Sequence, residues 1–258
     1  MTDRPLALVT GATAGIGLSF ARALAAQGYD LCLIARDAGR LATVAAELSR
    51  PSGPSVQWHS ADLSTDGGIA AVAPLIAELP RLDLLVNNAG FGTQGRFHRT
   101  PDGSQRVMTR LLAEAPVALC RAAIPGMVAR GRGAIINVSS IAGFLQSPGN
   151  VTYCAAKAFL TSFTLGLDVE LAGTGVRVQA LCPGFTRTEF HERMDFDQGR
   201  IPGWLWQGAD EVVARSLAQL ARGGAVICLP SFTVRLIRWG VRVVPRGVMK
   251  HLAVRRRR

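Results

Sequence analysis

The stretch LALVTGATAGIG, residues 6–17, decides the fold of this chain. A short, continuously apolar run ends at Thr10, and Gly11, Gly15 and Gly17 follow it in the spacing G-x-x-x-G-x-G. Such a run is typical of a strand that is covered on both faces. The glycines let a turn approach a ligand closely, and the free N–H groups of a helix that starts there favour a pyrophosphate. The stretch therefore predicts a nucleotide-binding turn between a first strand and a first helix.

The rest of the chain repeats this alternation of apolar runs and helix-length segments. Further apolar runs rich in Val, Ile and Leu occupy 30–36, 56–62, 82–89, 134–140, 176–183 and 225–230, and segments rich in Ala and Leu occupy 15–28, 37–50 and 153–172. Strands that alternate with helices pair in parallel through right-handed crossovers. We therefore predict an α/β fold, a single doubly wound domain of residues 1–230 with helices on both faces of its sheet.

Composition and charge limit the class of protein. At 258 residues, 48% apolar and 18% charged, the chain is typical of one globular domain. The five cysteines are odd in number and scattered, which favours a reducing cytoplasm and indicates neither a disulfide framework nor a metal site. No secretory signal and no membrane span are expected. The net charge of +11 resides in the C-terminal part, because residues 212–258 contain eleven Arg and Lys and no Asp or Glu.

The end of the second apolar run indicates which nucleotide binds. Proteins that bind NAD usually have Asp or Glu there for the ribose hydroxyls, whereas this sequence has Arg36. A guanidinium suits a 2′-phosphate, so NADP(H) is favoured over NAD(H). Asp37 follows one residue later, where it is expected to cap the next helix.

Five motifs in order resemble the short-chain dehydrogenase/reductase family. They are TGATAGIG (10–17), NNAG (87–90), Ser140 in INVSS, YCAAK (153–157) and PGFTRT (183–188). The resemblance implies a Rossmann-type domain with a seven-stranded parallel sheet. It also implies a homodimer or homotetramer that exchanges hydride between NADP(H) and a carbonyl or alcohol.

Carried over to this sequence, the resemblance implies roles for individual residues. The catalytic residues would be Ser140, Tyr153 and Lys157, with Tyr153 as acid/base, Lys157 as its activator and Ser140 bonded to the substrate oxygen. The nucleotide would be held by Gly11, Thr13, Gly15, Ile16, Gly17, Arg36, Asp62, Leu63, Asn88, Ala89, Gly90, Tyr153, Lys157, Pro183, Gly184, Thr186 and Thr188.

The pair Tyr153 and Lys157 has a physical rationale of its own. At i and i+4 the two side chains share a helix face. A free phenol has a pKa near 10, and a nearby ammonium lowers it. Lys157 is one of only two lysines beside 27 arginines, which indicates a chemical need for a compact ammonium here. The neighbouring Ser139 and Cys154 are interpreted as packing residues.

One position departs from the family pattern. Many members have an asparagine that helps to hold a water leading to the lysine, and the matching residue here is Leu112. Three explanations stay open: Thr109 or Glu114 takes that role, reprotonation is slower, or the protein binds nucleotide with weak or no turnover and acts through its tail.

Two segments relate to substrate and partners. Residues 189–208 contain Trp204 and Trp206 among charged residues and are interpreted as a lid for an apolar substrate, such as a steroid, retinoid or acyl compound. Residues 231–258 form a basic tail in which Arg235, Arg238, Arg242, Arg246 and Lys250 recur beside an apolar stripe of Val234, Ile237, Val241, Val244 and Val248. This pattern predicts an amphipathic helix that breaks before Pro245. It could lie on an anionic membrane, or dock on its own body or a twin subunit, while nucleic acid is disfavoured.

Overall fold

A seven-stranded parallel sheet forms the centre of the computed structural model, which describes residues 4–49, 53–189, 201–244 and 247. The strands are β1 (Leu6–Thr10), β2 (Asp30–Ala35), β3 (Val56–Ser60), β4 (Leu84–Asn87), β5 (Gly133–Val138), β6 (Val176–Leu181) and β9 (Ile227–Cys228). Their order is β3-β2-β1-β4-β5-β6-β9, and every neighbouring pair is parallel. The predicted fold class and sheet are confirmed.

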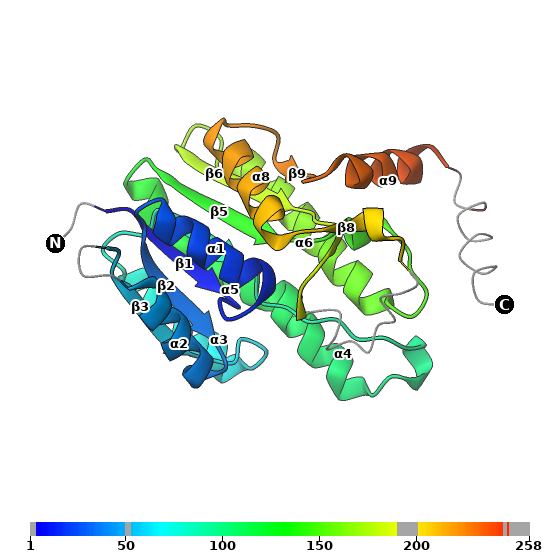
Figure 1. Cartoon of the computed structure of the whole chain (residues 1–258), viewed down its shortest axis with the longest axis horizontal. Coiled ribbons are helices and arrows are strands. Elements are labelled where there is room, and N and C mark those ends of the chain that lie inside the picture. Colours follow the sequence, from blue (N-terminus) through cyan, green and yellow to red (C-terminus); the bar gives the residue numbers. More distant parts are fainter. Residues whose placement is uncertain (1–3, 50–52, 190–200, 245–246, 248–258) are drawn as a thin grey trace.

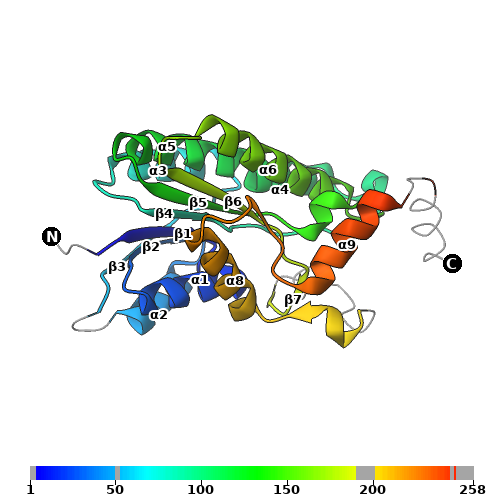
Figure 2. The same ribbon diagram turned by 90° about the horizontal axis from the view of Figure 1, so that it is seen from above.

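Helices cover both faces of this sheet (Figure 2). On one face lie α1 (Gly15–Ala26), α2 (Ala38–Leu48) and α8 (Ala209–Ala221); on the other lie α3 (Asp66–Glu78), α5 (Ala115–Ala129) and α6 (Val151–Glu170). Successive strand residues point to opposite faces. Val9 therefore packs with Phe20 of α1, while its neighbour Leu8 packs with Leu119 of α5. Two apolar cores with the sheet between them explain why the strands read as continuously apolar.

The direction in which successive strands are added to the sheet reverses between β1 and β4. β2 and β3 lie on one side of β1, whereas β4, β5 and β6 lie on the other. In open α/β sheets the crevice at such a switch point is where ligands bind. The loops that follow β1, β2, β4, β5 and β6 all open onto the carboxyl edge of the sheet.

A continuous helix, Asp102–Ala129, crosses the second face. It consists of α4 (Asp102–Thr109), a π-helical turn η2 (Arg110–Glu114) and α5. By length and composition alone this helix could cross a membrane. In the fold, however, Met108, Leu112 and Leu119 are buried against neighbouring elements, as in the core helix of a globular domain.

The chain beyond β6 returns to the carboxyl edge. A short parallel pair, β7 (Phe185–Thr186) and β8 (Trp206–Gln207), flanks the 3₁₀ turn η5 (Gly203–Leu205). The final helix described is α9 (Phe232–Val243), which packs against the 3₁₀ turn η3 (Ile141–Phe144). It ends at Val243, as expected before Pro245. Residues 190–200 of the expected lid, and residues 245–246 and 248–258 of the tail, lie outside the described residues.

Candidate active site

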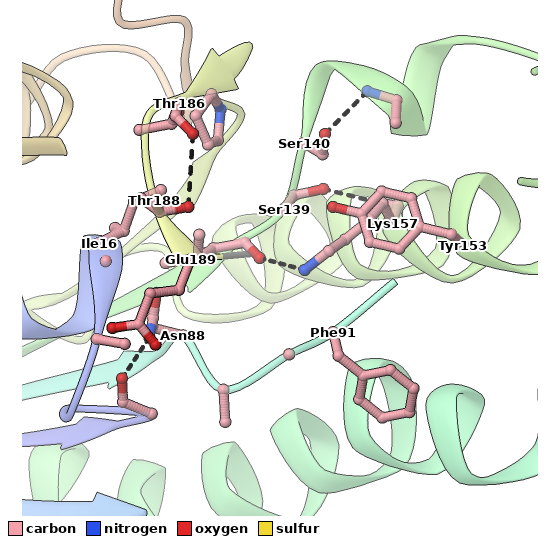
Figure 3. A pocket seen from close by; sticks show the side chains of 18 of the residues that line it. Ile16, Asn88, Phe91, Ser139, Ser140, Tyr153, Lys157, Thr186, Thr188 and Glu189 are labelled. Atoms are coloured by element: carbon pink, nitrogen blue, oxygen red, sulfur yellow. Dashed lines mark hydrogen bonds between the residues drawn. The ribbon is translucent and has the colours of Figure 1, made fainter. Parts of the chain in front are cut away.

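A cavity of about 1040 Å³ opens at the carboxyl ends of the strands (Figure 3). Ligand sites commonly measure ~300–1,000 Å³, so this cavity lies at the upper end of that range. It brings together residues from all five motifs. Its lining includes Gly11, Thr13, Gly15, Ile16, Arg36, Asp62, Leu63, Asn88, Ala89, Gly90, Ser140, Tyr153, Lys157, Pro183, Gly184, Thr186 and Thr188.

Gly17 is the one predicted binding residue that does not line the cavity. A Cβ on Gly17 would overlap the carbonyl oxygen of Gly11 and the amide nitrogen of Asn88. Its role is therefore close packing of α1 on the turn. Gly11 and Gly15, by contrast, line the cavity with φ of 65° and 52°, a backbone region that favours glycine.

The NNAG motif braces the glycine turn. The hydroxyl of Thr10 accepts hydrogen bonds from the backbone N–H of Asn88 at 2.9 Å and of Ala89 at 3.0 Å. The Asn88 amide donates to the carbonyls of Thr10 and Gly11. Two strands that are distant in sequence thereby hold the turn that opens α1.

Arg36 and Asp62 lie at the end of the cavity next to β2 and β3. Arg36 is exposed and follows β2. Burial alone would raise the pKa of Asp62, but hydrogen bonds from Ser64 and the charge of Arg36 outweigh burial and lower that pKa. Asp37 caps α2 by accepting from the backbone N–H of Arg40 at 2.9 Å, as predicted.

Arg40 is a cavity residue that the sequence analysis missed. Its guanidinium donates to the carbonyl of Thr13 at 2.9 Å and to both carboxylate oxygens of Glu189, at 2.7 and 3.1 Å. This pairing raises the pKa of Arg40. Glu189 is also a lining residue, so the ion pair spans the cavity between α2 and the segment after β7.

Ser140, Tyr153 and Lys157 lie together at the opposite end (Figure 3). Ser140 follows β5, and its hydroxyl accepts from the backbone N–H of Ala142 at 3.1 Å and is hydrogen-bonded to Tyr153. Lys157 lies one helical turn after Tyr153, with its Nζ 5.8 Å from the centre of the phenol ring. The Lys157 ammonium is buried and donates to the carbonyl of Val138 at 2.7 Å.

The protonation of this group differs from the expectation that the ammonium lowers the phenol pKa. Burial raises the pKa of Tyr153 to about 12, against a smaller opposing effect of the Ser140 hydrogen bond. Burial lowers the pKa of Lys157 to about 8. In both groups desolvation of the buried side chain is the largest effect on the pKa. At neutral pH the phenol therefore carries its proton and is poised to donate it.

The residues around this group are structural. The Ser139 hydroxyl donates to the carbonyl of Lys157 at 2.8 Å and lies 2.7 Å from the Thr161 hydroxyl, which supports its interpretation as a packing residue. Cys154 is buried. Leu112 is 1% exposed and packs with Met108 and Ala156, with Tyr153 beside them.

Neither candidate for the missing asparagine reaches the cavity. The Thr109 hydroxyl donates a hydrogen bond to the carbonyl of Gln105 at 2.9 Å. Glu114 is exposed and pairs with Arg110 at 3.4 Å. Leu112 does not line the cavity either but lies next to Gly90, where a Cβ would come 2.8 Å from Leu112 and 4.0 Å from the Lys157 Nζ.

The end of the cavity next to Ser140 and Tyr153 is apolar and is built from distant segments. Its lining includes Phe91, Ile141, Leu145, Ile201, Leu205, Val234 and Ile237. Ile201 and Leu205 belong to the described part of the expected lid, and Val234 and Ile237 belong to α9. The contribution of α9 was not foreseen, because the apolar stripe of the tail does not reveal which surface it covers.

The cavity fits a dinucleotide in two independent respects. The residue before α1, Ala14, has no side-chain acceptor for the first-turn N–H groups, and this turn has no acidic residue, so a pyrophosphate can accept from these groups. The exposed guanidinium of Arg36 suits a further phosphate, whereas Arg40 is already paired with Glu189. Among the described residues, no group of three His, Cys, Asp or Glu is arranged to hold a metal ion.

Comparison with known proteins gives consistent matches. Residues 5–198 match the family model of the short chain dehydrogenases. A putative ketoacyl reductase of granaticin polyketide synthesis from Streptomyces violaceoruber is 38% identical over 220 residues, which cover 81% of this chain and 76% of that protein.

Two solved structures share the fold over nearly the whole chain. A short-chain dehydrogenase from Sphingobium yanoikuyae in complex with NADPH superposes with a TM-score of 0.85 at 35% identity, covering 96% of this chain and 94% of that one. A bulky-bulky ketone specific alcohol dehydrogenase from Comamonas testosteroni gives 0.80 at 28% identity, covering 95% and 97%.

Proposed function

This chain belongs to the short-chain dehydrogenase family of oxidoreductases, and on that premise we propose that it is an NADP(H)-dependent reductase of apolar ketones or aldehydes. The observation that carries the proposal is the shared cavity. One end has the glycine turn and two arginines, and the other has Ser140, Tyr153 and Lys157 beside an apolar wall.

When bound, the nicotinamide supplies or accepts a hydride. The residues of this chain would bind, orient and protonate. Ser140 donates a hydrogen bond to the substrate carbonyl oxygen and Tyr153 gives that oxygen its phenolic proton. Lys157 supplies positive charge that stabilises the phenolate left behind. Burial raises the pKa of Tyr153 to about 12, so the phenol carries its proton at neutral pH, and the charge of Lys157 is needed to favour release of that proton.

The preference for NADP(H) rests on Arg36, which lines the cavity and is exposed. The preference for an apolar substrate rests on the lining from η3, η5 and α9. The similar dehydrogenase in complex with NADPH supports the first preference, and the similar bulky-bulky ketone specific alcohol dehydrogenase supports the second. The proposal includes a cytoplasmic homodimer or homotetramer, which the resemblance of the motifs favours.

A panel of lipophilic ketones with NADPH, followed by the loss of nicotinamide absorbance, tests the function. Tyr153→Phe should lower kcat/KM by about 10²–10⁴-fold, since the proton donor is removed, while NADPH binding measured by fluorescence persists. Tyr29→Phe, which alters the only other tyrosine, is the matched control and should keep full activity.

Buried Leu112 beside the lysine favours one alternative, a nucleotide-binding protein with weak or no turnover. Tight NADPH binding without turnover across the panel would favour this alternative. An unchanged rate in Tyr153→Phe would refute the catalytic assignment.

A further inference from the structure

Helix α9 presents two apolar faces, and in the part of the chain that the structure describes one is covered and the other is exposed. Val234 is 1% exposed and, with Ile237, lines the cavity. On the other face Phe232, Leu236, Trp239 and Val243 are 76%, 54%, 63% and 54% exposed. Their spacing of four, three and four residues aligns them in one stripe along the helix. We call these four side chains the outer stripe.

The outer stripe exposes more contiguous apolar side chain than a helix face in contact with water usually does. Isolated exposed apolar residues are ordinary, but a contiguous row that includes a tryptophan and a phenylalanine marks a contact surface. Figures 1 and 2 both place α9 at the end of the molecule toward which the strands point. The surface therefore lies beside the cavity.

Charge indicates what the outer stripe meets. Exposed Arg235 and Arg242 lie along one flank of the stripe, and α9 has no acidic residue. The nearest acid before it in the sequence is Glu211, and none follows. Arg238 is turned inward over the Phe144 ring at 5.0 Å and so belongs to the covered face.

A second copy of the chain is a poor occupant for this surface. A two-fold contact would bring each outer stripe against its equal, with arginines facing arginines and no carboxylate on the helix to offset them. An anionic lipid surface accepts both features, because acyl chains take the apolar stripe and headgroups take the arginines.

We propose that α9 binds the surface of an anionic bilayer through the outer stripe and its flanking arginines. Since the opposite face of the same helix lines the substrate end of the cavity, binding holds the cavity beside the membrane. A lipophilic substrate then reaches the site from the bilayer rather than from water. The lipid contact stands apart from the reductase function, and only the substrate route rests on it.

Co-sedimentation of the full chain with vesicles tests the lipid contact. Binding should be strong for phosphatidylcholine vesicles that contain phosphatidylglycerol, weak for phosphatidylcholine alone, and lowered by salt. On binding, Trp239 emission should shift to shorter wavelength, and Trp239→Phe should lose this shift while Trp204→Phe keeps it.

Two sets of variants separate apolar and charged contributions. Leu236→Asp with Trp239→Asp should reduce vesicle binding by about tenfold or more, because two inserted side chains become charged. The control Val169→Asp alters an apolar residue of α6 that is 78% exposed and should bind normally. Arg235→Gln and Arg242→Gln should each weaken binding about fivefold on anionic vesicles. Arg121 is an exposed arginine of α5, and Arg121→Gln should leave vesicle binding unchanged.

Three results would overturn the lipid contact. These are equal binding to both kinds of vesicle, unchanged binding of the Leu236 and Trp239 double variant, and dissociation of an oligomer by that variant in vesicle-free sedimentation. The last would make the outer stripe a subunit contact.

The substrate route has its own measurement. Anionic vesicles should raise the rate on a long-chain ketone dissolved in them and leave a water-soluble ketone unaffected. Vesicle binding without any turnover would refute the reductase function and leave the lipid contact standing.

Discussion

Two guanidinium groups, Arg36 and Arg40, mark the end of the cavity where a nucleotide phosphate is expected. Arg40 is held by Glu189 and by the carbonyl of Thr13, whereas Arg36 is exposed beside Asp62. Arg36 is therefore the guanidinium that can approach a phosphate, while Arg40 holds Glu189 and the glycine turn in place.

The substitution Arg36→Asp should move the cofactor preference toward NADH. A charge-assisted contact to a phosphate is lost and a like charge replaces it, so the ratio of kcat/KM for NADPH over NADH should fall about 10- to 100-fold. Initial rates with each cofactor measure this ratio. Arg121→Asp, on the surface of α5, should leave it unchanged. An unaltered ratio in Arg36→Asp would remove Arg36 from the nucleotide site.

The π-helical turn of residues 110–114 is the element that brings Leu112 to the catalytic group. Such turns are rare and often occur at functional sites. Here the turn is continuous with α4 and α5 and directs a leucine, rather than a hydrogen-bonding side chain, toward Tyr153 and Gly90.

Leu112→Asn should therefore cost stability. Replacing a leucine that is 1% exposed by a polar side chain loses apolar burial and leaves an amide to satisfy, which together cost about 2–5 kcal/mol of the free energy of unfolding. Urea unfolding measures the change. Leu112→Met conserves volume and should cost less than about 1.5 kcal/mol. An unchanged free energy of unfolding in Leu112→Asn would indicate that water already reaches this position.

Helix α9 should control substrate size from its inner face. Ile237→Phe adds bulk to the cavity wall and should raise KM for a bulky ketone about tenfold or more, with little effect on a small ketone. Leu236→Phe, one residue earlier on the exposed face, is the control and should change neither. Equal effects of both substitutions would refute the assignment of Ile237 to the substrate wall.

The molecule as a whole keeps all five of its cysteines buried and free. Burial raises the pKa of Cys32 and Cys182 to about 11 and that of Cys120 and Cys228 to about 12, and also raises that of Cys154. The folded state therefore retains thiol protons that the unfolded chain loses near pH 9. Stability from this source is complete below pH 9 and is lost as the pH rises toward 11–12.

Unfolding in urea with a reductant should accordingly show a free energy of unfolding that falls by about 3–5 kcal/mol between pH 9 and 10.5. Lys157 acts in the opposite direction, since burial lowers its pKa to about 8 and folding becomes more favourable as it deprotonates. Lys157→Met should therefore make the alkaline loss steeper. A free energy that stays constant to pH 10.5 would contradict the effect of the buried thiols.

Much of the candidate site was predictable because its residues follow strands. The turn after β1, Asn88 after β4, Ser140 after β5 and Pro183 after β6 must meet at one sheet edge once the strands are parallel. Arg40 and Glu189 were missed because 149 positions separate them and neither belongs to a motif. Val234 and Ile237 were predicted as part of an apolar stripe, but not as cavity residues, because the spacing of the tail shows an apolar face and not its partner.

The sequence alone determined the order of strands and helices, the glycine turn and the Tyr153–Lys157 pair, because each depends on spacing within a few residues or on a strict alternation of elements. Only the tertiary structure decided which face of α9 lines the cavity and that burial raises, rather than lowers, the pKa of Tyr153. Both depend on which distant segments exclude water from a group, and burial of that kind leaves no local pattern in the sequence.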